Sequence, residues 1–144
     1  MTTATELQPV ADKFDADTLS ASKPRSIRDI EADLSKPIAP RHLKQRRQGG
    51  TELTYIEWHT AIKYLSLFAP GWSYAVKSVS LVGNLVTVIA SISIPAAEGV
   101  ITRDSTGCED VNAKGYGDAV SNAEAMALKR AASKFGLALH LYLK

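Results

Sequence analysis

The chain has 144 residues, 45% of them hydrophobic and 22% charged, which is ordinary for a soluble globular protein with one domain. Its single cysteine, Cys108, excludes an intramolecular disulfide and a cysteine cluster for zinc. No run of about 18 apolar residues occurs, and no apolar stretch follows a basic start, so we expect neither a membrane span nor export.

The net charge of +2 is unevenly divided along the chain. Residues 1–40 hold seven acidic and five basic side chains, whereas residues 41–144 hold eight acidic and twelve basic ones, a net charge near +4. A basic domain favours a polyanionic partner. Charge alone leaves both a polyanionic partner and a surface of merely solvated lysines open.

Residues 1–25 are predicted to form a flexible N-terminal arm, because they are rich in Thr, Ala, Asp and Ser and carry apolar residues at no steady period. A single domain is predicted at 26–144. Its first element begins behind Ser26, where apolar residues recur at helical spacing. This pattern predicts a short amphipathic helix that ends before Pro37.

The densest positive cluster of the chain lies in residues 40–50, PRHLKQRRQGG. Four bases fall within seven positions with no acid among them: Arg41, Lys44, Arg46 and Arg47. We expect an exposed basic helix face or a basic loop next to a flexible Gly-Gly joint. Such a cluster is suited to phosphate contacts.

A second helix is predicted from Thr54 to about Phe68, with Pro70-Gly71 ending it. Glu57 and His59 fall within this range and could be imagined as an acid and base pair. Positions two apart on a helix point in different directions, so we expect no shared site. His59 is therefore assigned a structural role.

After this helix the hydrophobic period changes to two, which predicts strands. Residues 72–82 and 85–94 flank Gly83-Asn84, a two-residue turn typical of a β-hairpin. A third strand is predicted from Gly99 to Gly107. The second strand presents one apolar face that must be covered, formed by Val86, Val88, Ala90, Ile92 and Ile94.

The cover is predicted to be a long Ala-rich helix from Asp118 to Gly136, opened by a reciprocal cap between Ser121 and Glu124 and stopped at the glycine. The expected fold is therefore α+β, a three-stranded antiparallel meander packed on this helix (a β-β-β-α core) behind N-terminal helices. Residues 137–144 are expected to form a terminal strand or the end of a helix.

Unpaired bases mark the second half of this helix. Lys129, Arg130 and Lys134 have no carboxylate within one helical turn on the C-terminal side. Before the helix, residues 114–117 (KGYG) lack the spacing and the Lys-Ser/Thr of a nucleotide-binding P-loop. We expect an exposed turn there and no ATP site.

Three segments in this order resemble the annealing domain of the Rad52 superfamily of single-strand annealing proteins: TYIEWH at 54–59, the three predicted strands, and ALKRAASKFG at 127–136. The branch that the chain resembles most is DdrA, the bacterial DNA damage response protein A. The resemblance covers about residues 27–143. It implies a protein without enzymatic activity or cofactor that binds single-stranded DNA independently of ATP, in DNA repair by homologous recombination.

Such a protein protects 3′ ends or anneals complementary strands, and it assembles into a homo-oligomeric ring with the DNA in a basic groove. The partners that the resemblance implies are single-stranded DNA, further copies of the chain and other repair proteins, with no membrane. The implied location is the cytoplasm of a bacterium, in association with the nucleoid.

The resemblance also implies a set of DNA-binding residues. Lys129 and Arg130 match backbone phosphate contacts at the floor of the groove, and Tyr55 matches an aromatic residue at its entrance. The family's basic position before the Gly-Gly joint falls on Gln45, and a further family base falls on Ser133. The full predicted set is Lys44, Arg46, Arg47, Tyr55, Lys114, Lys129, Arg130 and Lys134.

Three alternatives remain open from the sequence. A double-stranded-RNA-binding module shares the order of elements, but the acidic start of the last predicted helix would repel phosphate. A metal-dependent nuclease would use Glu109, Asp110 and Asp118, although these carboxylates lack the lysine and spaced acids of such a site. The third alternative is a purely structural oligomer in which the Ala-rich helix is an interface.

Overall fold

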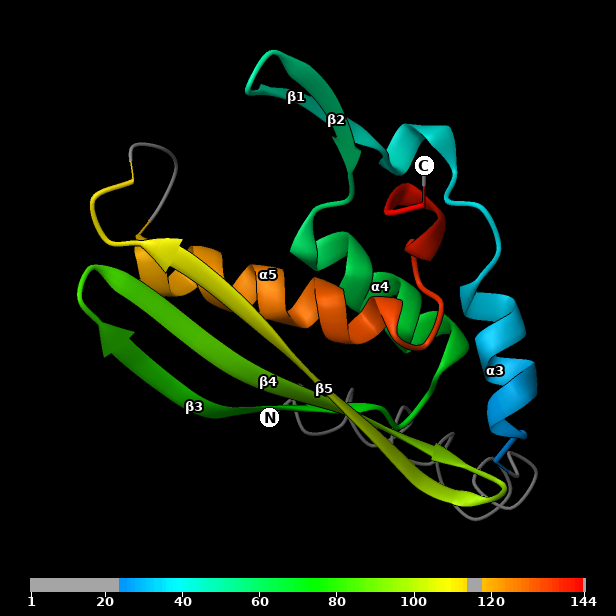
Figure 1. The fold of residues 1–144 in the computed structure, drawn as a ribbon. Helices are drawn as coiled ribbons and strands as arrows, with labels where there is room; N and C mark the ends of the chain where they lie inside the picture. Colours follow the sequence, from blue (N-terminus) through cyan, green and yellow to red (C-terminus); the bar gives the residue numbers. More distant parts are fainter. Residues whose placement is uncertain (1–23, 114–117, 144) are drawn as a thin grey trace, which may run out of the picture.

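The computed structural model describes residues 24–113 and 118–143. In chain order, the elements are α3 (Ile27–Leu34), η1 (Pro40–His42), β1 (Lys44–Gln48), β2 (Thr51–Tyr55), α4 (Trp58–Phe68), β3 (Ser73–Val82), β4 (Leu85–Ala96), β5 (Gly99–Asp110), α5 (Ala119–Ser133) and η2 (Leu139–Leu141). The α+β class is confirmed (Figure 1). The predicted loop at 114–117 and all but the last two residues of the predicted arm lie outside the described residues.

The main sheet has the antiparallel order β3-β4-β5, as predicted. The pairing of Val79 with Val88, and of Val88 with Gly107, fixes its register. Alternation along β4 turns its apolar residues toward α5, and the five residues of the predicted face are all buried. β3 is an edge strand. Nine of its ten residues are exposed, and the tenth, Tyr74, is half-buried.

β5 continues three residues beyond the predicted end at Gly107. This glycine lies inside the strand because α5 touches the strand backbone there. A Cβ atom at Gly107 would lie 2.0 Å from the carbonyl oxygen of Ala123 and 2.6 Å from the amide nitrogen of Ala127. The glycine therefore marks a close approach of helix and strand, not a turn.

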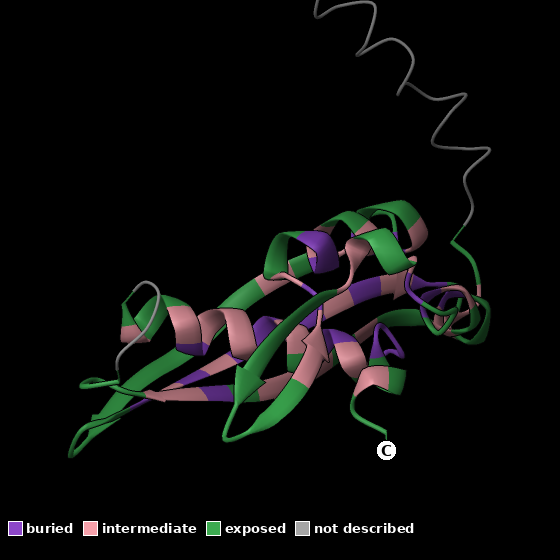
Figure 2. Ribbon diagram, turned by 90° about the horizontal axis from the view of Figure 1, so that it is seen from above, coloured by how far each residue is buried: buried purple, intermediate pink, exposed green. Residues whose placement is uncertain are grey.

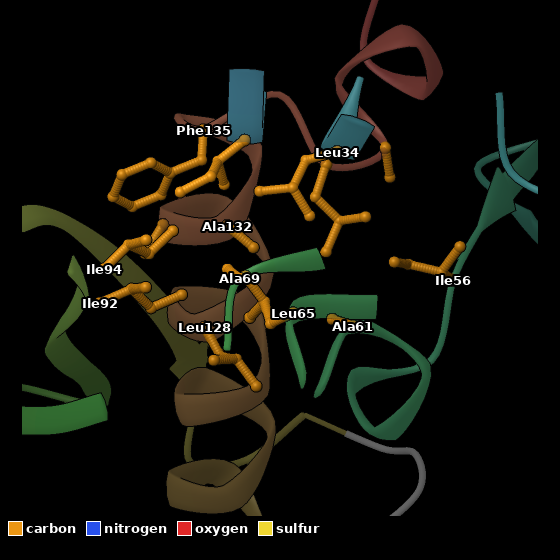
Figure 3. Packing of buried hydrophobic residues seen from close by; sticks show 14 of the residues in the cluster. Leu34, Ile56, Ala61, Leu65, Ala69, Ile92, Ile94, Leu128, Ala132 and Phe135 are labelled. Carbon is orange, nitrogen blue, oxygen red and sulfur yellow. The ribbon is translucent and has the colours of Figure 1, made fainter. Parts of the chain in front are cut away.

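The core lies between the sheet and the helices (Figure 3). Phe135 and Leu128 of the α5 region pack with Ile92 and Ile94 of β4, and Leu34 and Leu65 join them from α3 and α4. Burial is concentrated in this central region, whereas the hairpin tips and much of β3 are exposed (Figure 2). Each helix consequently has a fixed position relative to the sheet.

The start of α5 differs from the predicted cap. Asp118 is the N-cap residue, and its carboxylate accepts hydrogen bonds from the Ser121 amide at 2.8 Å and from the Ser121 hydroxyl at 3.1 Å. Glu124 instead accepts a bond from the Tyr74 hydroxyl at 3.1 Å. The helix begins one turn earlier than a Ser121 cap would allow, and Gly136, with φ of 108°, follows its end as predicted.

Residues 44–55 form a second, two-stranded sheet, which the sequence analysis missed. Gly49 and Gly50 both have positive φ, 59° and 79°, as in the tight turn of a β-hairpin. Three members of the basic cluster, Lys44, Arg46 and Arg47, thus lie in a strand rather than on a helix face or in a loop, and Arg41 lies in η1. The helix α4 begins at Trp58 rather than Thr54. In residues 137–143, the described part of the C-terminal segment, the regular element is the short 3-10 turn η2 and not a strand. None of the helices in the described ranges has the length and hydropathy to cross a bilayer.

Candidate nucleic-acid interface

The β1–β2 hairpin stands away from the main sheet, on the other side of α5 (Figure 1). Its pairing sets Lys44 opposite Tyr55 and Arg46 opposite Leu53. Because side chains alternate between the faces of a strand, Lys44, Arg46 and Tyr55 share one face. Arg47, paired with Glu52, lies on the other face.

The Tyr55 ring lies close to basic side chains from both the hairpin and α5. The Arg46 guanidinium lies 5.2 Å from the centre of the Tyr55 ring, and the Lys129 ammonium lies at the same distance. Both distances are within the range of a cation–π interaction. The structure therefore brings three of the predicted residues together from two separate elements.

Lys129 is partly buried beside this ring. Its ammonium donates one hydrogen bond, 3.1 Å long, to the carbonyl oxygen of Ile56. Burial lowers the pKa of Lys129, the positive charge of Arg46 lowers it further, and the Glu57 carboxylate opposes both effects. An ammonium has three N–H donors, so among the described residues this group keeps unused donor capacity in a setting that disfavours its charge.

Glu57, which favours the charge of Lys129, is also close to two other basic groups. Its carboxylate is 4.0 Å from the Lys44 ammonium and 3.5 Å from His59 Nε2. The prediction that the Glu57 and His59 side chains point in different directions is wrong, because Glu57 is the extended N-cap residue of α4, with φ of −77° and ψ of 154°. Helical angular spacing therefore does not apply to this pair.

Arg130 and Lys134 lie on another side of α5, over β5. Arg130 donates to the carbonyl oxygen of Thr106 at 3.3 Å, and Lys134 donates to that of Asp104 at 2.5 Å. Both side chains are exposed, and neither bonds to the hairpin in the described part of the chain. Lys114 lies outside the described residues.

Arg103, another basic residue near the end of α5, has a structural role. Its guanidinium forms a 2.6 Å ion pair with Glu31, donates to the carbonyl oxygen of Lys134 at 2.7 Å and lies 4.5 Å from the centre of the Phe135 ring. These contacts join α3, β5 and the end of α5. Arg103 is committed to packing.

The Tyr55 site, defined here as Lys44, Arg46, Tyr55, Glu57 and Lys129, combines an aromatic ring with three positive charges and one acid. Lysine and arginine neutralise phosphates, and an aromatic ring stacks on any base. The participation of Glu57 and of the Ile56 carbonyl could not be read from the sequence, because both depend on where α4 begins.

The carboxylates of the nuclease alternative have other partners. Asp118 caps α5, and Glu109 accepts a hydrogen bond from the Asn122 amide at 3.2 Å. Within the described ranges, no three His, Cys, Asp or Glu side chains are grouped so that they could hold a metal ion. These acids serve the junction of β5 and α5.

Two plant proteins from Arabidopsis thaliana are similar to this chain. DNA repair RAD52-like protein 1, mitochondrial, is 40% identical over 130 residues, which are 89% of this chain and 73% of that protein. DNA repair RAD52-like protein 2, chloroplastic, is 36% identical over 136 residues, 91% of this chain and 66% of that protein. The predicted location in a bacterial cytoplasm is contradicted, because both relatives are named for organelles of a eukaryote.

The sequence model of a repair family matches residues 26–144, nearly all of the predicted domain. That family is described as Rad52/22 double-strand break repair proteins. The match includes the hairpin, the main sheet and α5, and thus every described residue of the Tyr55 site. The chain belongs to the Rad52/22 family of double-strand break repair proteins.

Proposed function

We propose that the chain binds single-stranded DNA at the Tyr55 site through the sugar–phosphate backbone. The carrying observation is Lys129, a partly buried ammonium that uses one donor on the Ile56 carbonyl oxygen. A phosphate placed there would accept its remaining donors and relieve the unfavourable charge. Arg46, 5.2 Å from the centre of the Tyr55 ring, supplies a second cation.

This chemistry supports strand annealing. A protein that anneals complementary strands must hold the backbone and leave the base edges free to pair. The compact ammonium of Lys129 and the planar guanidinium of Arg46 both donate hydrogen bonds to phosphates. The Tyr55 ring can stack on any base, so this contact does not depend on the sequence of the DNA. The proposed activity needs no covalent step and no cofactor. We therefore propose a non-enzymatic protein that anneals strands or protects 3′ ends during homologous recombination, as the resemblance to DdrA implies.

We also propose that the chain acts as a homo-oligomer, in the form of a ring. β3 supports this proposal because it is an exposed edge strand that carries apolar side chains, with Val79 and Leu81 53% and 62% exposed. Their partners in β4, Val88 and Val86, are buried in the cluster with Ala123 and Ala127 of α5, whereas Val79 and Leu81 stay exposed. Repetition of the Tyr55 site around an assembly would multiply a weak affinity.

The hairpin offers a matched test of the DNA site. Arg46→Ala and Arg47→Ala remove the same charge from adjacent positions on opposite faces. We expect Arg46→Ala and Lys129→Met each to weaken binding of a labelled oligothymidylate about tenfold, from the loss of one charge-assisted contact of roughly 1.5 kcal/mol. Fluorescence anisotropy measures the affinity, and annealing of complementary labelled oligonucleotides without ATP measures the activity.

Arg47→Ala should change either quantity less than about twofold, because Arg47 lies on the face of the hairpin opposite Arg46 and Tyr55. Circular dichroism should show all three variants folded. Equal losses in Arg46→Ala and Arg47→Ala would reduce the hairpin's role to general positive charge. Binding of duplex RNA in preference to single-stranded DNA would support the double-stranded-RNA-binding alternative instead.

A further inference from the structure

A second basic surface lies beside the Tyr55 site, between η1 and α4. It consists of two depressions, of about 370 Å³ and about 230 Å³, that share four lining residues. We call this surface the α4 hollow and define it by those residues, Arg41, His42, Lys63 and Tyr64. The function proposed above does not use it.

The aromatic wall of the hollow is held in place. The Tyr64 hydroxyl is 2.8 Å from His42 Nδ1 and accepts a 3.4 Å hydrogen bond from the Ala39 amide. The His42 and Tyr64 rings meet edge to face, with centres 5.5 Å apart. The centre of the Phe68 ring is 6.3 Å from that of the Tyr64 ring, and both residues line the larger depression. The hollow therefore has a fixed shape before any ligand enters.

The charges of the hollow are unbalanced. Of the two acids along its edges, Asp33 is ion-paired with Arg25 at 2.7 Å and with Lys36 at 3.1 Å, and Glu57 lies 4.0 Å from Lys44. Arg41 and Lys63 are exposed, and neither forms an ion pair with an acid in the described part of the chain. Two cations thus face one concave surface without a counter-charge.

The smaller depression is continuous with the Tyr55 site. Lys44 and Glu57, which belong to that site, also line the depression beside His59 and Lys63. An anionic strand leaving the Tyr55 ring consequently meets Lys44, then Lys63 and Arg41, along one connected surface. A long polyanion fits this arrangement better than a small anion, since the cations are spread over η1, β1 and α4.

We infer that the α4 hollow is an additional binding site for the phosphate backbone of the same single-stranded DNA, with Arg41 and Lys63 as the phosphate contacts and Tyr64 as the apolar wall. This inference rests on the proposed function, because it extends the path of a strand held at the Tyr55 site. The longer path gives each subunit more phosphate contacts than the Tyr55 site alone provides.

The test compares two double variants of the full chain. Arg41→Ala with Lys63→Ala removes both contacts, whereas Arg28→Ala with Lys77→Ala removes two exposed bases from α3 and β3, outside the hollow. For a 30-nucleotide oligothymidylate, we expect the hollow variant to bind about tenfold more weakly at moderate salt. The plot of log affinity against log salt has a negative slope, and its magnitude should decrease by about 1.4, which is 0.7 for each of the two lost phosphate contacts. The control should retain the wild-type slope.

Lysine acetylation followed by mass spectrometry adds a readout at the site itself. Bound oligothymidylate should protect Lys63 from the reagent and leave Lys77 reactive. The inference would be overturned if the hollow variant kept the wild-type slope or if Lys63 were not protected. Weaker binding by Lys129→Met would in that case still support the proposed function. Equal protection by inorganic phosphate at the same concentration would assign the hollow to small anions and also overturn it. A wild-type chain that binds no single-stranded DNA would reject both proposals.

Discussion

The charge of Lys129 is influenced by burial and by two charged neighbours. Burial and the Arg46 guanidinium disfavour the ammonium, and Glu57 favours it. A buried cation is normally retained where something compensates it. In this chain the Ile56 carbonyl oxygen compensates part of the cost, and a bound phosphate would compensate more. The residue is thus suited to bind an anion at little further loss of hydration.

The lowered pKa of Lys129 predicts a pH dependence of binding. A phosphate raises this pKa again, so binding takes up a proton under alkaline conditions, and affinity should fall as pH rises through the pKa of the free site. Lys129→Arg should bind with a flatter profile, because a guanidinium does not titrate in this range. Affinity for oligothymidylate between about pH 7 and pH 10 checks this, and parallel profiles would contradict it.

The same shift affects stability with the opposite sign. Protonated Lys129 is disfavoured in the fold, so the unfolded state binds more protons between the two pKa values. The contribution of Lys129 to the free energy of unfolding therefore rises with pH through the folded pKa and becomes constant above the unfolded one. Binding and stability thus respond to alkaline pH in opposite directions.

At the scale of elements, the contact of α5 with β5 depends on Gly107. Gly107→Ala would place a methyl group against the backbone of α5, so we expect the free energy of unfolding to fall by about 3 kcal/mol. Thr106→Ala, at the exposed neighbouring position, should cost less than about 1 kcal/mol. Urea unfolding followed by circular dichroism measures both, and similar values for the two variants would remove the steric explanation.

Elements with a strong hydrophobic period were predictable from the sequence. The alternation in β4 gave the face that α5 covers, and the glycine at 136 gave the end of that helix. The β1–β2 hairpin was not predictable in this way, because KQRRQ has no apolar residue and all five of its positions are exposed. Only the adjacent glycines carried a signal, and these also suit a flexible joint.

The candidate site was predictable residue by residue but not as an arrangement. The sequence named Lys129, Arg46 and Tyr55, and the structure places them together. The sequence alone could not distinguish the role of Arg46 from that of Arg47, because their assignment to opposite faces requires the strand register. Arg130, adjacent to Lys129 in sequence, extends over β5 because consecutive helical positions diverge by about 100°.

At the scale of the whole molecule, β3 provides a test of assembly. Val79→Lys with Leu81→Lys adds two charges on the side of the sheet that faces α5, and Ser78→Lys with Ser80→Lys adds them on the other side. We expect the first pair to shift oligomers toward monomers in light scattering, because two ammonium groups resist burial in an interface. The serine pair should leave the mass unchanged. Loss of assembly in both would point to net charge instead of the apolar strip.

The contact at Gly107 has a consequence for how a strand would be spaced along an assembly. A helix that rests on a strand backbone cannot roll or slide without a steric clash, so Lys129 is kept at one height above the sheet. If copies join through their sheets, the interval between successive lysines is set by the repeat of the subunits. The spacing of the phosphate contacts along the flexible DNA strand would then equal the repeat distance of the subunits.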